Sequence, residues 1–277
     1  MRWKQLPLLI AGVVMLAACG SAVSVPSDPD APILQIRTDG GFAPIEWILS
    51  NGPTYTLLAD GRLIVPGPAF EFYPGPIVLN YQVSQVGDQD FEQILDLVAE
   101  MGLPEMTSEI DDSAAGFVAD AGTTMVSFWD DAGVHQYSVY ALGIELDPEN
   151  PTIASNPETA AFMKLIVRLD KSRGSSDSVP YEPERVRVLA GVAMAPVDPG
   201  LEDVRPWPLG DDDPANWEQL ELGWACSAYG PEALELFQEA SEITQWMDPD
   251  PMMDAPPYTL LVRPLHPGEE DCVVPSP

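Results

Sequence analysis

The stretch YTLLADGRLIV, residues 55–65, places two apolar runs on either side of an Asp-Gly pair. Gly61 accepts the positive φ that a tight hairpin turn requires. The stretch therefore predicts a β-hairpin with its tip at Asp60-Gly61. It also indicates a sheet in which neighbouring strands run antiparallel.

More strands are expected on both sides of this hairpin. ILQIRT (33–38) and IEWILS (45–50) have strand-like compositions and flank a Gly-Gly turn, and VLNYQVSQV (78–86) is a further candidate. Residues 123–142 predict a second hairpin, which turns at Asp130 to Gly133. Later strands are expected at 185–195, around 220–226 and at 258–265.

Helical periodicity occurs in three places. Residues 88–102 predict a helix that Asp88 or Asp90 caps and Gly102 ends. A second helix is expected from Asn156-Pro157 and a third from Pro231. Their apolar stripes are Phe91, Ile94, Leu95, Val98 and Met101; Phe162, Leu165, Ile166 and Leu169; and Ala233, Leu236, Phe237 and Ala240.

This order of strands and helices predicts an α+β fold, with antiparallel sheets and about three packed helices. Residues 33–171 would form a larger lobe and residues 185–277 a smaller one. Residues 172–184 are a linker between the lobes or a long surface loop.

The chain is strongly acidic. It has 44 acidic and 12 basic residues and a net charge of −32, with no Lys or Arg between Arg62 and Lys164. Such a surface argues against nucleic acid and against anionic lipid headgroups as partners. We interpret the charge as a solvated surface that keeps the protein soluble. A salty or acidic habitat, or loose binding of divalent cations, is the alternative.

The N-terminus has the pattern of a secretory signal. Arg2 and Lys4 precede an apolar run from Leu6 to Ala18, which would be about 20 Å long as a helix, against roughly 30 Å of membrane hydrocarbon. The run is too short for a comfortable membrane span, so residues 1–18 predict a signal peptide. Residues 19–32 are rich in Ser, Pro and Asp and predict a flexible tether.

The sequence Leu16-Ala17-Ala18-Cys19 resembles the lipobox of bacterial lipoprotein precursors. The resemblance implies cleavage before Cys19 and a diacylglycerol thioether on its sulfur. The protein would then be anchored by lipid to the extracytoplasmic face of the cell membrane. An ordinary signal peptide followed by an unrelated cysteine is the alternative.

The rest of the chain resembles uncharacterised secreted lipoproteins of high-GC bacteria. The likeness lies in GGFAPIEW (40–47), the Asp-Gly hairpin and RPLHPGEEDC (263–272), and it implies no activity. If Cys19 is lipidated, Cys226 and Cys272 are the remaining cysteines. An even number outside the cytoplasm predicts a disulfide, with free buried thiols as the alternative.

No motif predicts a cofactor, a metal site or a catalytic residue. The two histidines, His135 and His266, belong to no H-E-x-x-H, and C-x-x-C, G-x-S-x-G and phosphate-loop patterns are missing. Ser127, His135 and Asp131 lie around one hairpin, but they are too constrained locally to predict a triad. Carboxylate pairs occur in expected turns, at Asp111-Asp112, Asp130-Asp131, Asp211-Asp212-Asp213 and Glu269-Glu270.

The best candidate for a binding surface is the aromatic group Phe70, Phe72 and Tyr73, within a Pro- and Gly-rich passage. Rigid aromatic side chains supply contact area at low entropic cost. Phe70 and Phe72 have the same strand parity, so the alternative is that both point into the core. Trp207, between two prolines, has the same two interpretations.

We therefore expect a lipid-anchored extracytoplasmic protein that is a non-catalytic binding or envelope-associated module, with a protein or glycan partner that remains to be identified. The alternative is a secreted hydrolase that uses two facing carboxylates to cleave cell-wall or environmental glycan.

Overall fold

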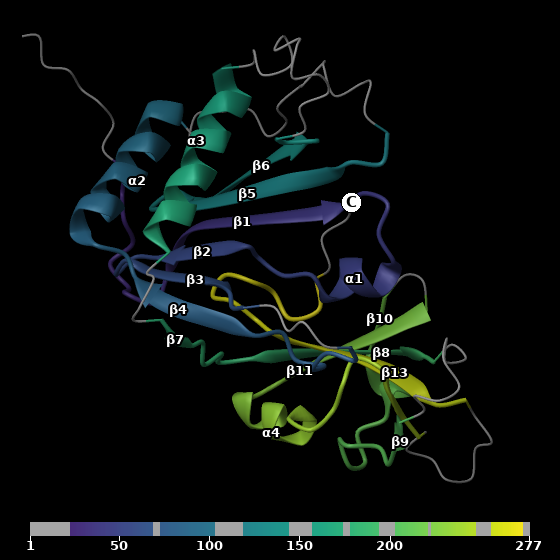
Figure 1. Cartoon of the computed structure of the whole chain (residues 1–277). Helices are drawn as coiled ribbons and strands as arrows, with labels where there is room; N and C mark the ends of the chain where they lie inside the picture. Colours follow the sequence, from purple (N-terminus) through teal and green to yellow (C-terminus); the bar gives the residue numbers. More distant parts are fainter. Residues whose placement is uncertain are drawn as a thin grey trace, which may run out of the picture.

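The computed structural model describes residues 23–68, 73–102, 119–143, 157–173, 178–193, 203–220, 223–247 and 256–273. These residues form an α+β fold with two largely antiparallel sheets, as the sequence predicts (Figure 1). None of the helices in these ranges is long and apolar enough to cross a membrane.

The first sheet has seven strands in the order β6-β5-β1-β2-β3-β4-β7. They are β1 (Pro32–Gly40), β2 (Tyr55–Leu58), β3 (Arg62–Pro66), β4 (Tyr81–Gln85), β5 (Gly122–Asp130), β6 (Gly133–Tyr140) and β7 (Val179–Pro180). Both predicted hairpins are present: Leu57 pairs with Leu63, and Asp130 pairs with Gly133. Gly61 has the expected positive φ, at +85°.

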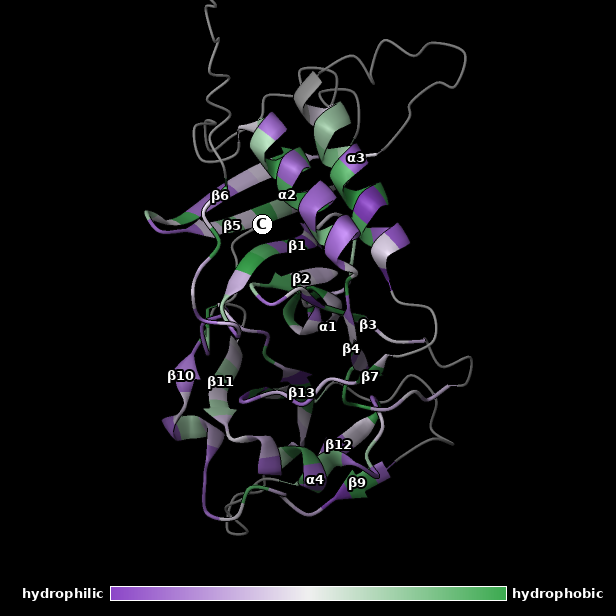
Figure 2. Ribbon diagram, turned by 90° about the vertical axis from the view of Figure 1, so that its left-hand side faces the viewer, coloured by the Kyte–Doolittle hydropathy of each residue, from purple (hydrophilic) through white to green (hydrophobic). Residues whose placement is uncertain are grey.

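Helices α2 (Asp88–Met101) and α3 (Pro157–Ser172) cover one face of this sheet (Figure 1). Hydrophilic and hydrophobic positions alternate along both helices, as expected where one face of a helix is buried (Figure 2). The predicted stripes supply Ile94, Val98, Phe162, Leu165 and Leu169 to the core, all at most 1% exposed.

The ends of α2 agree with the prediction only in part. Gly102 ends the helix in the left-handed conformation, at φ +62°. The N-cap, however, is Gly87, with no capping side chain, so the expected cap at Asp88 or Asp90 is wrong. Both acids lie in the first turn instead, where the positive end of the helix dipole favours them, and Asp90 also pairs with Arg168.

Residues 45–50 form helix α1 (Ile45–Ser50), so the strand expected there is wrong. Leu49 is buried against Leu189, Trp224 and Cys226 of the second sheet. Propensity in a six-residue segment is weak, and this tertiary contact decides in favour of the helix.

The second sheet has six strands in the order β10-β11-β8-β13-β12-β9. They are β8 (Val186–Val192), β9 (Asp203–Arg205), β10 (Glu218–Gln219), β11 (Trp224–Tyr229), β12 (Thr244–Trp246) and β13 (Tyr258–Pro264). All pairs are antiparallel except β12 with β9. A short 3₁₀ helix (Pro214–Asn216) precedes β10.

The third predicted helix is much shorter than expected. It consists of a 3₁₀ turn (Pro231–Ala233) and α4 (Leu234–Phe237). Phe237 and Ala240 pack into the core of the second sheet, whereas Leu236 is 50% exposed. The stripe is therefore buried only in part.

The two sheets are interlocked by segments that cross in both directions. Residues 73–79 leave the first sheet, and Ile77 enters the core of the second, where its N–H donates to the Ala240 carbonyl. In the opposite direction, the chain after β13 lies against the first sheet. Gly268, at φ +85°, lies so close to Pro32 and Trp129 that a Cβ atom would come within 3.0 Å of both.

The segments expected to be flexible have specific contacts where the structure describes them. Val23 and Val25 of the expected tether pack against the core beneath α2 and α3. In the expected linker, β7 pairs with β4, and Tyr181 N–H donates to the Tyr81 carbonyl. Strand pairing thus begins within the segment that would separate the lobes.

Candidate functional site

Two arginines are buried where the sheets face each other. Side chains alternate along a strand. The valines of Val186-Arg187-Val188 therefore enter the core next to α4, and Arg187 points to the opposite face of the sheet. On β13, Arg263 lies directly opposite Arg187. The two arginines are 2% and 1% exposed.

Arg263 is neutralised by Glu269. The guanidinium donates from Nη1 and Nη2 to the two carboxylate oxygens of Glu269, at 2.8 and 2.9 Å. The His266 N–H donates to the same carboxylate at 2.8 Å. Burial alone would raise the pKa of Glu269, but Arg263 outweighs it and lowers this pKa to about 2.

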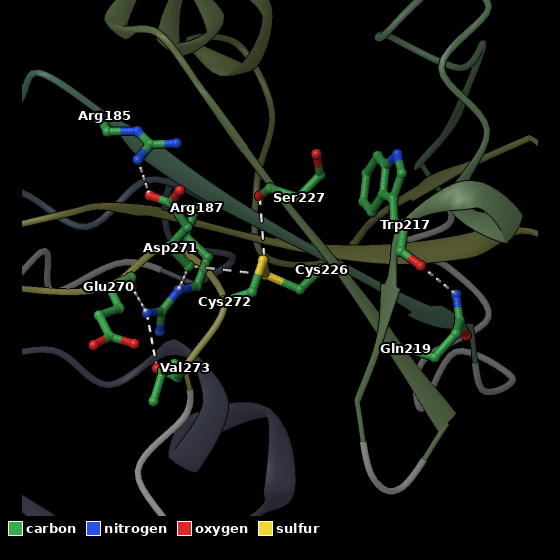
Figure 3. Close-up of a disulfide and its surroundings, with 10 residues drawn as sticks. All are labelled: Arg185, Arg187, Trp217, Gln219, Cys226, Ser227, Glu270, Asp271, Cys272 and Val273. Carbon is green, nitrogen blue, oxygen red and sulfur yellow. Dashed lines mark hydrogen bonds and ion pairs between the residues drawn. A yellow bond between two sulfur atoms is a disulfide. The ribbon is translucent and has the colours of Figure 1, made fainter.

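Arg187 is held by backbone carbonyls (Figure 3). Its Nε donates to the carbonyl of Asp271 at 2.5 Å, and Nη2 donates to those of Glu270 at 2.7 Å and Val273 at 3.0 Å. Burial, together with the neighbouring Arg263, lowers the pKa of Arg187 to about 10.

The predicted disulfide between Cys226 and Cys272 holds the segment that supplies these carbonyls (Figure 3). The two Cα atoms are 5.7 Å apart, and the cysteines are 46 positions apart in the chain. Because Cys226 lies in β11, the bond ties the C-terminal segment directly to the second sheet.

His266 joins this segment to the first sheet. Its Nδ1 lies 2.8 Å from Thr56 Oγ1, which also accepts a hydrogen bond from Gln35 Nε2 at 3.2 Å. Thr56 is fully buried, so its hydroxyl and the His266 ring nitrogen satisfy each other across the junction between the sheets.

The His266 ring is neutral at neutral pH, because burial lowers its pKa to about 3. It packs edge-on against Tyr81 and Tyr181, with ring centroids 4.4 and 5.3 Å away. Its Nε2 is buried and has no hydrogen-bond partner among the described residues.

A small, partly open pocket of about 180 Å³ adjoins His266. Its lining consists of Asp30, Tyr181, Glu184, Arg185 and residues 265–269. Five lining side chains already have partners. Glu269 binds Arg263, the Tyr181 hydroxyl donates to the Leu265 carbonyl, and Arg185 pairs with Asp271. Asp30 binds Arg62, and His266 contacts Thr56. These contacts offer little support for catalysis.

Each described carboxylate pair or run has at least one member whose side chain binds a structural partner. Asp130 accepts from the N–H groups of Ala132 and Gly133, and these bonds, with His135, outweigh burial and lower its pKa. Asp212 accepts from Trp217 Nε1 and the Tyr229 hydroxyl, at 2.9 and 2.6 Å. Asp111-Asp112 lies outside the described residues.

The residues Ser127, His135 and Asp131 form no triad. Ser127 lies opposite Gln136 and His135 opposite Phe128, which places the serine and the histidine on opposite faces of the sheet. His135 Nε2 instead lies 3.1 Å from Asp130 Oδ1. Among the described residues, no three His, Cys, Asp or Glu side chains are grouped to hold a metal ion.

The predicted aromatic surface is described only at Tyr73, which is 69% exposed; Phe70 and Phe72 lie outside the described residues. Trp207 is half-buried and packs against the core of the second sheet. Its ring centroid lies 5.9 Å from that of Trp217, and its Nε1 donates to the Asp212 carbonyl.

The structure also has a second aromatic surface, which we did not predict. Phe42 is 95% exposed and Trp47 is 47% exposed, on residues 40–47, here called the aromatic loop. Phe42 N–H donates to the Asp120 carbonyl, and Gly41 has a φ of +77°, where a side chain would be strained and its Cβ would lie 3.2 Å from the same carbonyl oxygen. Asn51 fixes the far end of α1 by donating to the Thr38 carbonyl.

Comparison with known proteins gives no relative for this fold or these sites: no family model, curated protein or solved structure matches the chain.

Proposed function

We propose that this chain is a lipid-anchored extracytoplasmic binding module, which contacts a protein partner through the aromatic loop. The near-complete exposure of Phe42 carries the proposal. A large apolar side chain held in water by a hydrogen-bonded loop is typical of an interface anchor, and Phe and Trp are enriched at such positions.

The position of the N-terminus supports this arrangement. Ser24, five positions after Cys19, donates to Asp131 and so lies beside the β5–β6 turn. Phe42 follows the other end of β1, a nine-residue strand about 30 Å long. An anchor at Cys19 would therefore leave the aromatic loop at the end of the sheet farther from the lipid.

The charge of the loop favours a basic partner. Glu46 lies in the first turn of α1, and Asp120 is exposed beside Phe42. An apolar pocket rimmed by Lys or Arg would complement both the aromatic and the acidic side chains. The hydrolase alternative has less support, because each described acid pair has at least one member that already binds a structural partner.

The anchor is tested by growing the producing cells with a radiolabelled fatty acid. We expect label on the native chain and none on Cys19→Ser, which would be released or remain an uncleaved precursor. Label retained by the serine variant would refute the lipobox interpretation.

Binding is tested by crosslinking and capture from the native membrane, with Phe42→Ser and Trp47→Ser beside Tyr73→Ser as the matched exposed aromatic. Binding through the aromatic loop is supported if Phe42→Ser and Trp47→Ser each capture at least about tenfold less of one identified protein than the parent does, while Tyr73→Ser captures as much as the parent. Equal capture by all variants, or retention on cell-wall glycan in place of a protein, would refute it.

A further inference from the structure

Strand β6 forms a long edge of the first sheet. It is the terminal strand beside β5, and no described strand pairs with its outer side (Figure 1). β6 has eight residues, whereas β7 at the opposite edge has two. Short edge strands resist pairing with other chains, and long ones invite it.

The register shows which backbone groups face outward. Asp130 and Gly133 close a two-residue turn and are paired in the ladder, so they exchange both backbone hydrogen bonds. Alternation then directs the N–H and C=O groups of His135, Tyr137 and Val139 toward β5. Those of Val134, Gln136 and Ser138 face the outer side.

Within the strand itself, the charged residues, prolines and bulges that commonly block edge pairing are missing. Its sequence, GVHQYSVY, contains no Lys, Asp, Glu or Pro. The pairing with β5 is regular along its whole length, without a bulge. Val134 is 52% exposed on this edge. Strands of this composition and regularity favour addition of another strand.

We infer that a second copy of this chain pairs with β6 in an antiparallel, two-fold arrangement. Centred on Tyr137, the two-fold places Gln136 of each copy opposite Ser138 of the other. Both residues direct their backbone groups outward, so these positions form hydrogen-bonded pairs. The two seven-stranded sheets then become one continuous sheet.

Local charge favours the antiparallel orientation over a parallel one. The acidic turn of each copy, at Asp130 and Asp131, would lie beside residues 141–143 of the other copy, which carry no charge. The two acidic turns are then separated by the length of β6, about 25 Å, which exceeds the Debye length of roughly 8 Å at physiological salt. A parallel pairing would place these turns side by side.

The test is sedimentation velocity of the purified full chain in a density-matched neutral detergent. We expect a concentration-dependent dimer that strengthens between about 0.05 and about 0.5 M salt, because each copy has a net charge of −32. A chain that stays monomeric over this range would overturn the inference.

Two variants test the edge itself. Val134→Lys adds a charge to the exposed edge, and Gln136→Pro removes an N–H that faces away from β5. Each should raise the dimer dissociation constant at least about tenfold, with circular dichroism and melting temperature close to the parent. Val192→Lys changes a valine that is 60% exposed in the other sheet and should remain dimeric.

A dimer that persists in both edge variants would refute pairing through β6. Orientation is tested in the double variant Gln136→Cys/Ser138→Cys, which should form an intermolecular disulfide under mild oxidation. If neither edge variant retains the parent spectrum, this crosslink decides: a covalent dimer supports the inference and its absence overturns it. Neither measurement depends on the aromatic loop.

Discussion

Arg187 and Arg263 lie directly opposite each other on neighbouring strands, and both are almost completely buried. Two adjacent guanidinium groups repel each other, and each loses its hydration when it is buried. The chain compensates them differently: Arg263 binds a carboxylate, and Arg187 binds three backbone carbonyls. Both sets of partners come from the segment after β13, so this segment is essential to the junction between the sheets.

Removing the Glu269 carboxylate should strongly lower the free energy of unfolding. Glu269→Gln leaves Arg263 buried without a counter-charge, and we expect the free energy of unfolding to fall by about 3–5 kcal/mol in urea titrations. Glu270→Gln is the matched control. Its side chain is exposed and only its carbonyl contacts Arg187, so this variant should remain within about 0.5 kcal/mol of the parent. Equal effects would contradict the assignment.

His266 should make the protein sensitive to mild acid. Its folded pKa is about 3, below the ordinary value of 6.5, so the unfolded chain binds a proton that the folded chain does not. Stability is therefore retained above pH 6.5 and declines as pH falls from 6.5 toward about 3, by at most about 1.4 kcal/mol per pH unit.

The window between pH 7 and pH 5 isolates this histidine, because Glu269 begins to contribute only below its ordinary pKa of 4.5. Urea titrations across the window should show about 2 kcal/mol of decline in the parent and a flatter profile in His266→Gln. A flat parent profile would show that His266 is not buried and neutral.

The disulfide should contribute strongly to stability. It closes a loop of 46 positions, for which the chain-entropy model gives about 4 kcal/mol. We expect the double variant Cys226→Ser/Cys272→Ser to lose about this amount in urea titrations. In the native protein, neither cysteine should react with iodoacetamide until a reductant is added, and two reactive thiols without reductant would contradict the bond.

The two faces of α1 should respond differently to truncation. Leu49 is 6% exposed and packs against the second sheet, so Leu49→Ala should lower the free energy of unfolding by about 2–4 kcal/mol. Trp47 is 47% exposed, and Trp47→Ala should lower the free energy of unfolding by much less than Leu49→Ala does. Thermal and urea unfolding would show the contrast, and the opposite order would reverse the assignment of the faces.

Local patterns in the sequence were sufficient for the hairpins and the two long helices. The Asp-Gly turn at residue 60 and the stripe from Phe91 to Met101 depend on contacts within a few residues, which the sequence displays directly. The disulfide followed from the number of cysteines and from the expected compartment.

Features that depend on distant contacts were missed. Residues 45–50 became a helix because Leu49 meets the second sheet, about 140 positions further along the chain. The alternation around Arg187 correctly indicates a strand, but it normally places arginine in solvent. Only the folded arrangement brings Glu269 and the C-terminal carbonyls to that face. The aromatic loop was missed because its first residues, Gly40-Gly41, were interpreted as a simple turn and its last three, 45–47, as the start of a strand.

Each sheet contributes a chain segment that packs against the other sheet, and this exchange has a consequence for proteolysis. A protease that cleaves after Arg173 would cut the chain between α3 and β7, yet residues 73–79 would remain embedded in the C-terminal piece and residues 264–273 would still cover the N-terminal one. The nicked protein should therefore stay whole in native buffer and separate only in denaturant. By the same logic, the two pieces expressed as separate chains should reassemble by fragment complementation, each supplying a missing part of the other's interior.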